Sequence, residues 1–264
     1  EGKYSYGKAE ALKFPLGSLL NTTRQGLKRK PRKGSLIEFL WDGIEKIANA
    51  RPTQVSFHIT TNSFAFRRGN RGALGEENRT TIVMTPKHPS SPDGVFNAMA
   101  LFHEAMHYAT SMEGWGKISK EAAAAFTEKA RFLLDKIYNT SEKDLKKLFK
   151  KDPELYEQFL LELDYVRQTD TQEQRESGPF KGTQEFTAQI VEGTGLFYAI
   201  EQMQLSQEEL RALDKSLSAQ FKNYVADLYN AILDFFLPNR KRNPKTVSGA
   251  RFFTHAFSEL TEAV

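Results

Sequence analysis

The chain has 264 residues, of which 39% are hydrophobic and 20 are phenylalanine, so it has enough apolar surface for one large domain with its own core. It contains no cysteine, which excludes disulfides and any zinc site built on thiolates. The net charge of +4 is only mildly basic, and no apolar run approaches the roughly 20 residues that cross a bilayer. These features predict a soluble globular protein without a transmembrane segment.

The N-terminal part of the chain is unusually basic. Residues 1–34 are rich in Gly, Lys and Arg, so we expect a partly ordered basic arm followed by one domain over residues 35–264. Positive side chains gather at 24–33 and again at 240–245. Such clusters are usually solvated loops, and contact with nucleic acid or with an acidic membrane surface is the alternative. Because no aromatic residues are interleaved with them, base stacking is disfavoured and we expect no nucleic-acid partner.

The segment after this arm mixes one helix pattern with short strand patterns. Ser35 can cap a helix that runs to about residue 50, with apolar residues on one side. Apolar and polar residues then alternate over Val55–Ile59, and a β-branched run follows at Thr80–Thr85. We therefore expect two or three strands of a small sheet, with a Gly- and Arg-rich loop at 67–78 between them.

The rest of the chain is predicted to be almost wholly helical. Asp93 is a suitable N-cap for a helix that continues to about Ser111. The expected fold class is α+β and mostly α-helical, with a small sheet and a long helical insertion at 120–176. Further helices are indicated at Ser119, at Ser141, after Asp152–Pro153, from Thr183 to about Gln202, at Ser206 with Glu209, and from Val247 to about Thr261.

Residues 103–107 read His-Glu-Ala-Met-His, which is the H-E-x-x-H pattern, in a strongly helical context. A spacing of four residues places His103 and His107 on one face of a helix, one turn apart. Both imidazoles can then reach one zinc ion at about 2.0–2.1 Å. Glu104 lies next to that face, where it is suited to taking a proton from water rather than to binding the metal. The pattern predicts a Zn²⁺ site with Glu104 as the general base.

Two histidines leave a catalytic zinc site one protein ligand short. The extended motif with a third histidine is absent, since residues 110 and 113 are Thr and Glu. We favour Glu185, which lies near the start of an apolar helix after a polar loop. Glu192, two turns later on the same helix face, is the alternative metal ligand, and either glutamate can instead orient a histidine. The other histidines formally available as ligands are His58, His88 and His255.

This combination of residues resembles the gluzincin branch of the zincin metallopeptidases. Glu185-Phe186-Thr187-Ala188 is similar to the Glu-Phe-x-Ala segment with the third zinc ligand in the group that includes anthrax lethal factor. Residues 182–185, Gly-Thr-Gln-Glu, are also similar to the Gly-Thr-x-Asp motif of aspzincins, although Glu replaces the Asp and the Tyr-Gly of that motif is missing. The resemblance covers residues 80–111 and 182–195. It implies a zincin fold, in which two helices bear the ligands and an edge strand pairs with the peptide substrate.

Two further expectations concern the substrate. The oxyanion of the transition state needs a donor besides the metal, and Tyr198 and His255 are our candidates, with Tyr165 as a third and packing as the alternative role for each. The resemblance further implies that the Thr80–Thr85 strand, with the loop before it, is the edge that binds a peptide by β-augmentation. Arginines around this strand favour acidic substrate residues, with simple solvation as the alternative: Arg67, Arg68, Arg71 and Arg79.

The residues together predict a zinc-dependent endopeptidase whose partner is a protein or peptide substrate. A secreted bacterial effector or toxin, delivered into a host cell, is one setting for a cysteine-free peptidase of this kind, and a housekeeping or phage-encoded peptidase is the other. An inactive zincin-like binding module and a basic nucleic-acid-binding protein are the alternative functions. The intact Glu104 argues against the first, and the H-E-x-x-H pattern has no role in the second.

Overall fold

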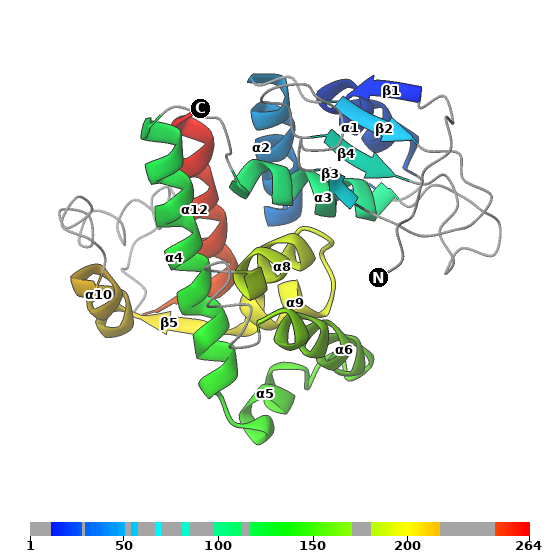
Figure 1. The fold of residues 1–264 in the computed structure, drawn as a ribbon. Coiled ribbons are helices and arrows are strands. Elements are labelled where there is room, and N and C mark those ends of the chain that lie inside the picture. The colour runs from blue at the N-terminus through cyan, green and yellow to red at the C-terminus, as the bar shows by residue number, and fades with distance from the viewer. Residues whose placement is uncertain are drawn as a thin grey trace, which may run out of the picture.

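Figure 1 shows a computed structural model of the chain. It describes residues 12–27, 30–50, 54–57, 67–69, 81–84, 98–111, 117–170, 181–216 and 246–264. This part is mostly helical with two small sheets, which confirms the predicted α+β fold class. The elements are β1 (Leu12–Pro15), α1 (Leu16–Gly26), α2 (Leu36–Ala50), β2 (Gln54–Phe57), β3 (Arg67–Gly69), β4 (Thr81–Met84), α3 (Ala98–Ser111), α4 (Lys117–Asn139), α5 (Glu142–Leu148), α6 (Glu154–Thr169), α8 (Lys181–Ile190), α9 (Gly195–Gln202), β5 (Gln204–Ser206), α10 (Gln207–Ser216), β6 (Thr246–Ser248) and α12 (Gly249–Glu262).

The larger sheet has four strands in the order β1-β2-β4-β3. β2 and β4 run parallel, with Val55 opposite Ile82. The outer strands are antiparallel to their neighbours, so β1 pairs with β2 and β3 pairs with β4. Both strands predicted from alternation and β-branching, over Val55–Ile59 and Thr80–Thr85, are present in the described residues as β2 and β4.

The expectation that the Thr80–Thr85 strand forms an edge of the sheet is wrong. β4 lies inside the sheet because β3, from the segment predicted as a loop, covers its free side. Arg67, Arg68 and Gly69 of β3 are opposite Val83, Ile82 and Thr81. The edge on this side of the described sheet is therefore β3, which Figure 1 draws as the strand of the sheet nearest to α8.

Part of the predicted basic arm is ordered structure. Residues 12–26 form β1 and α1, and β1 is an outer strand of the sheet. Leu16 and Leu20, one turn apart on α1, have no exposed surface and belong to the main core. Burial of two leucines stabilises a fold by a few kcal/mol, roughly 1.5–3 kcal/mol each. The basic composition of this segment thus concealed an amphipathic helix, and residues 1–11 lie outside the described residues.

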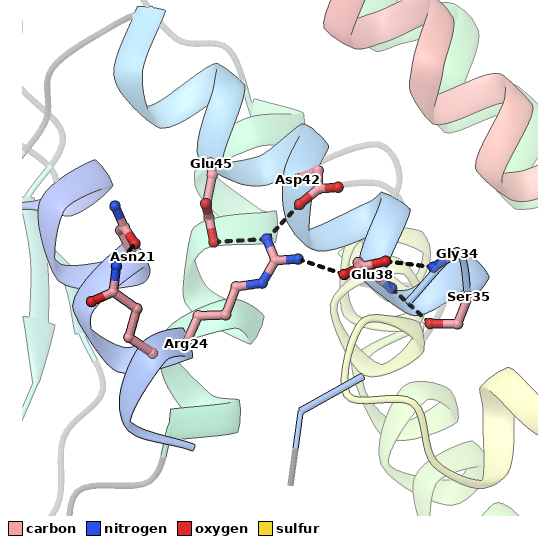
Figure 2. Close-up of polar contacts among 8 residues, drawn as sticks. Asn21, Arg24, Gly34, Ser35, Glu38, Asp42 and Glu45 are labelled. Atoms are coloured by element: carbon pink, nitrogen blue, oxygen red, sulfur yellow. Dashed lines mark hydrogen bonds and ion pairs between the residues drawn. The ribbon is translucent and has the colours of Figure 1, made fainter. Parts of the chain in front are cut away.

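Arg24 on α1 is bound by three carboxylates of α2 (Figure 2). Its guanidinium contacts Asp42, lies 3.3 Å from Glu45 Oε1 and lies 3.4 Å from Glu38 Oε1. The three acids follow at i, i+4 and i+7, so they share one face of the helix. This member of the first basic cluster therefore fastens α1 to α2 instead of offering a free positive charge to a nucleic acid.

The start of α2 follows the predicted capping signal (Figure 2). The Ser35 hydroxyl accepts a hydrogen bond from the backbone N–H of Glu38 at 3.2 Å. The Glu38 carboxylate in turn accepts one from the backbone N–H of Gly34 at 2.6 Å. These reciprocal bonds satisfy backbone donors at the helix start and resemble a capping box.

α4 and α12 lie side by side along much of their lengths, as the green and red helices of Figure 1 show. Phe126 of α4 meets Phe253 and Phe257 of α12 with ring centroids 5.3 and 5.5 Å apart. Residues of α4 and α6 belong to the main core, so the described part of the segment predicted as an insertion, residues 120–170, packs into the core. α4 also begins at Lys117, before Ser119, whose hydroxyl donates to the Ala263 carbonyl at 2.9 Å.

The helix predicted from Thr183 to about Gln202 is two helices, α8 and α9. The break falls at residues 191–194, where Gly193 has a left-handed φ of +72° that an L side chain rarely adopts. The capping predictions at Ser141 and at Ser206 with Glu209 are confirmed. Ser141 accepts from the Asp144 N–H, and Ser206 and Glu209 exchange two bonds of 3.2 and 2.7 Å at the start of α10.

A second, two-stranded sheet joins β5 to β6 and was not predicted, because strands of three residues show too little alternation. In the described part of the chain, the helices are too short or too polar to cross a membrane. Several predictions fall outside the described residues: the turn at 238–244, the N-cap Asp93, the histidines His58 and His88, and the arginines Arg71 and Arg79.

Candidate metal centre

The H-E-x-x-H pattern lies on α3, as predicted. The opposite face of this helix is apolar and buried, and Phe102 stacks on Trp41 of α2 with centroids 4.0 Å apart. The Trp41 indole N–H donates to the Val191 carbonyl at 2.9 Å, so α2 and α3 are tied to the segment that follows α8. With its core face held in this way, α3 presents His103 and His107 together. Their Nε2 atoms lie 3.2 Å apart.

Glu185 reaches both histidines from α8. Its Oε2 lies 3.4 Å from His103 Nε2, and its Oε1 lies 3.3 Å from His107 Nε2. Helices α3 and α8 pack against each other, which brings residues far apart in the sequence to one point. The three side chains predicted as metal ligands thus converge, and among the described residues they form a group whose ligand atoms all lie within 4.8 Å of one another.

The spacing of these atoms fits a tetrahedral metal ion. A tetrahedral site with ligand bonds of about 2.0–2.1 Å has ligand atoms about 3.3 Å apart. The three observed separations are 3.2, 3.3 and 3.4 Å, although Glu185 uses a different oxygen toward each histidine. Glu185 Oε2 is buried and, within the described residues, accepts no hydrogen bond. A buried carboxylate oxygen without a donor is costly unless a cation faces it, so the residues fit a zinc ion.

The electrostatics of the centre favour positive charge. Burial opposes protonation of His103, but the neighbouring carboxylates of Glu185 and Glu192 outweigh it and raise the pKa of His103 to about 9. Burial likewise opposes ionisation of Glu185, yet His103 and His107 lower the pKa of this carboxyl to about 2. A proton on His103 and a metal ion at the centre supply the same sign of charge to the same carboxylates.

Glu192, the alternative metal ligand, lies on the other side of His103. Its Oε1 is 2.8 Å from His103 Nδ1, whereas His103 Nε2 faces His107 and Glu185. A carboxylate at Nδ1 cannot reach an ion held at Nε2 of the same ring without turning the ring over. The structure therefore favours Glu185 as the third ligand and gives Glu192 a different contact.

Glu104 and Tyr165 complete the polar surroundings of the centre. Glu104 is partly exposed on α3 and directly follows His103 in sequence. Burial, followed by the negative charges of Glu185, Glu104 and Glu192, raises the pKa of the Tyr165 phenol. Tyr165 lies on α6, which packs on α8, and about half of its side chain is exposed. Of the three predicted oxyanion donors, Tyr165 is the one in the field of the metal-site carboxylates.

The two favoured oxyanion donors have their recorded contacts elsewhere. The centroid of the Tyr198 ring lies 5.2 Å from that of Phe149, which also contacts the rings of Tyr156 and Phe159. His255 Nδ1 lies 3.9 Å from a carboxylate oxygen of Glu259, one turn along α12. Burial lowers the pKa of His255 and Lys129 adds to this effect, whereas Glu259 and Glu262 oppose it. These contacts do not involve the three metal-site side chains, and the role of either residue as the oxyanion donor stays a prediction. No local signal in the sequence points to Tyr165 instead, because its place depends on how α6 packs.

A buried ion pair lies beside the first turn of α8. Arg131 of α4 donates two hydrogen bonds to Asp170 at the end of α6, at 2.9 and 2.8 Å, and the Asp170 side chain is only 2% exposed. Gly182 of α8 packs on the same aspartate, since a Cβ at this position would lie 2.2 Å from the Asp170 Cβ. Glu185 follows one turn later. The pair between α4 and α6 thus helps to set the position of the third ligand.

Comparison with protein-family models, curated proteins and solved structures finds no match for this chain. The functional assignment therefore depends on the geometry of the centre.

Proposed function

We propose that the chain is a zinc-dependent endopeptidase of the gluzincin type, with His103, His107 and Glu185 as the ligands that would hold zinc. The observation that supports this most directly is the triangle of ligand atoms with sides of 3.2, 3.3 and 3.4 Å. Two ligands on one helix and the third on a second, packed helix are also what the resemblance to gluzincins implies. When bound, the zinc supplies a Lewis acid that acidifies water and polarises the substrate carbonyl.

The chain's own residues then divide the remaining chemistry between them. Glu104 takes a proton from the attacking water and later passes it to the leaving amine. The Tyr165 phenol donates a hydrogen bond to the oxygen of the substrate carbonyl as negative charge develops there. Its raised pKa keeps the phenol protonated, and therefore able to donate, across the neutral range. His103, His107 and Glu185 are anchored by the core faces of their helices, so they need little reorganisation during the reaction.

For the substrate, we propose pairing along β3. This strand is the edge of the described sheet on the β4 side, and an extended peptide can add to such an edge through backbone hydrogen bonds. β3 is antiparallel to β4, so a peptide that runs antiparallel to β3 is parallel to β4. Backbone pairing accepts many sequences, which leaves the selection of the cleaved bond to side-chain contacts outside this strand.

Digestion of a defined peptide library by the zinc-loaded chain, with products identified by mass spectrometry, tests this function. We expect cleavage at internal peptide bonds, loss of cleavage after treatment with a chelator, and recovery when zinc is added. Peptide binding without cleavage by zinc-loaded protein would favour the inactive binding module. Cleavage that persists in the chelator-treated protein would contradict a metal-dependent mechanism.

A further inference from the structure

The contact between His103 and Glu192 also determines which nitrogen of the neutral His103 ring carries the hydrogen. A neutral imidazole has one N–H and one free lone pair, and an ionised carboxylate can only accept a hydrogen bond. In the neutral ring, which is the form that binds a metal ion, the separation of 2.8 Å between His103 Nδ1 and Glu192 Oε1 therefore places the hydrogen on Nδ1. This leaves the lone pair on Nε2, the nitrogen that faces Glu185 and His107.

We infer that Glu192 is a positioning residue, which fixes the ring orientation and the tautomer of His103 so that Nε2 is ready to bind the metal. The inference rests on the proposed zinc site. Carboxylates that accept a hydrogen bond from a metal-binding histidine also increase its basicity, and their removal typically weakens metal binding roughly 10–100-fold.

The backbone around Glu192 is shaped to hold this contact. Glu192 lies in the turn between α8 and α9, where its N–H donates to the Gln189 carbonyl at 3.2 Å. Gly193 donates to the Ile190 carbonyl at 3.1 Å and has the φ of +72° that turns the chain away from α8. Without this turn, α8 would continue and its next residues would follow the helix path. The break in the predicted long helix thus sets the position of the residue that contacts His103.

Helix α6 holds the turn from the outside. The Glu162 carboxylate accepts hydrogen bonds from the backbone N–H groups of Leu196 at 2.7 Å and Gly195 at 3.3 Å, at the start of α9. A Cβ at position 195 would lie 2.4 Å from the backbone nitrogen of Phe159, so only glycine allows α6 and α9 to approach this closely. The Trp41 indole holds the Val191 carbonyl from the other side. The turn is therefore held by α2 and α6 together, and little freedom is left for Glu192.

The test is zinc affinity, measured on the full chain by competition with a chromogenic chelator, for the wild type and for Glu192→Ala, Glu192→Gln and Glu201→Ala. We expect Glu192→Ala to bind zinc roughly 10–100-fold more weakly. Glu192→Gln should fall between it and the wild type, because the amide oxygen still accepts from Nδ1. Glu201, an exposed glutamate on α9, is the matched control and should leave affinity unchanged.

A second readout follows the tautomer directly. In ¹⁵N-resolved NMR spectra of the zinc-loaded wild type, His103 should have its proton on Nδ1, and this signature should weaken or shift in Glu192→Ala. Thermal melts of the metal-free variants show whether each one folds. A wild type that binds zinc while Glu192→Ala binds it equally well, or a proton on Nε2 of His103, would overturn the inference and leave the proposed function intact. A wild type that binds no zinc overturns both.

Discussion

The Nε2 atoms of His103 and His107 lie 3.2 Å apart, and each also lies within 3.4 Å of an oxygen of Glu185. Lone pairs on two imidazoles and a carboxylate repel one another at this range unless a proton or a metal ion lies between them. The fold nevertheless holds all three on helices whose other faces are buried. The arrangement therefore favours a cation at this point, and its consequences can be measured.

Removal of the general base should separate metal binding from hydrolysis. Glu104→Gln keeps the size of the side chain but cannot take a proton from water. We expect peptide cleavage to fall roughly 10²–10⁴-fold, the usual range for a positioned acid–base group. Zinc content should stay at the wild-type value, because the ligand atoms belong to other residues. Steady-state cleavage assays and metal analysis of the same preparation check both parts, and unchanged cleavage would rule out Glu104 as the base.

Tyr165 and Tyr198 form a matched pair for the oxyanion donor. Tyr165→Phe should lower kcat roughly 10²–10³-fold, the cost of losing one oxyanion donor, with little effect on KM or zinc content. Tyr198→Phe should leave kcat near the wild-type value, since the Tyr198 ring packs on Phe149 and the substitution keeps this ring. The measurement is kcat and KM for one good peptide substrate. Equal losses in the two variants, or a loss confined to Tyr198→Phe, would refute the assignment.

The metal-free protein should lose stability on both sides of neutral pH. The pKa of His103 is raised from 6.5 to about 9, so its protonated form stabilises the fold fully below about pH 6.5, and this contribution is lost as the pH rises through 9. The pKa of Glu185 is lowered from 4.5 to about 2, so its contribution is present above about pH 4.5 and is lost as the pH falls toward 2. The declines in stability at high and at low pH therefore both report the interaction between His103 and Glu185.

Thermal melting of the chelator-treated protein between pH 3 and pH 10 measures these flanks. His103→Ala should remove the alkaline decline and most of the acid decline that depends on Glu185. Zinc should abolish the alkaline decline in the wild type, because the metal ion takes over the place of the proton. A midpoint that stays constant from pH 6.5 to pH 9 in the metal-free wild type would contradict the electrostatic account of the centre.

Asp170 and Asp135 both bind Arg131, so the replacement of each in turn tests the ion pair at the start of α8. Asp170→Ala removes the buried acid of this ion pair and leaves Arg131 with Asp135 alone, and we expect a loss of roughly 1–3 kcal/mol in the free energy of unfolding. Asp135, on the other side of the same arginine, is 47% exposed, so Asp135→Ala should cost less than about 1 kcal/mol. Denaturant unfolding of both variants gives the comparison. Equal costs would show that the buried pair does not fix α8.

Local signals in the sequence predicted the parts of the molecule that depend on a few neighbouring residues. The H-E-x-x-H spacing predicted the convergence of two imidazoles, and Ser35, Ser141 and Ser206 were identified correctly as helix starts. Glu185 was also found from the sequence, since a carboxylate near the start of an apolar helix was a reasonable partner for the two histidines. Helix geometry links such short patterns directly to structure.

The parts that were missed depend on contacts between distant segments. The place of β4 within the sheet depends on β3, whose Arg-Arg-Gly sequence has no strand pattern. The α8–α9 break falls at Gly193, whose left-handed φ the sequence alone does not reveal, and the close approach of α6 to Gly195 depends on tertiary packing. Tyr165 lies in the field of the metal-site carboxylates only because α6 packs on α8. Leu16 and Leu20 were not recognised as core residues, because residues 1–34 are basic in composition and only tertiary packing buries this helix.

The zinc content of the purified chain and of its Glu185→Ala variant tests the central claim most directly. The account predicts one tightly bound zinc per wild-type chain, and a loss of tight binding in Glu185→Ala, while a folded control such as Glu201→Ala keeps its metal. Zinc that remains tightly bound in Glu185→Ala would contradict the ligand set. A wild type that binds no zinc, even after reconstitution, would contradict the metal centre itself.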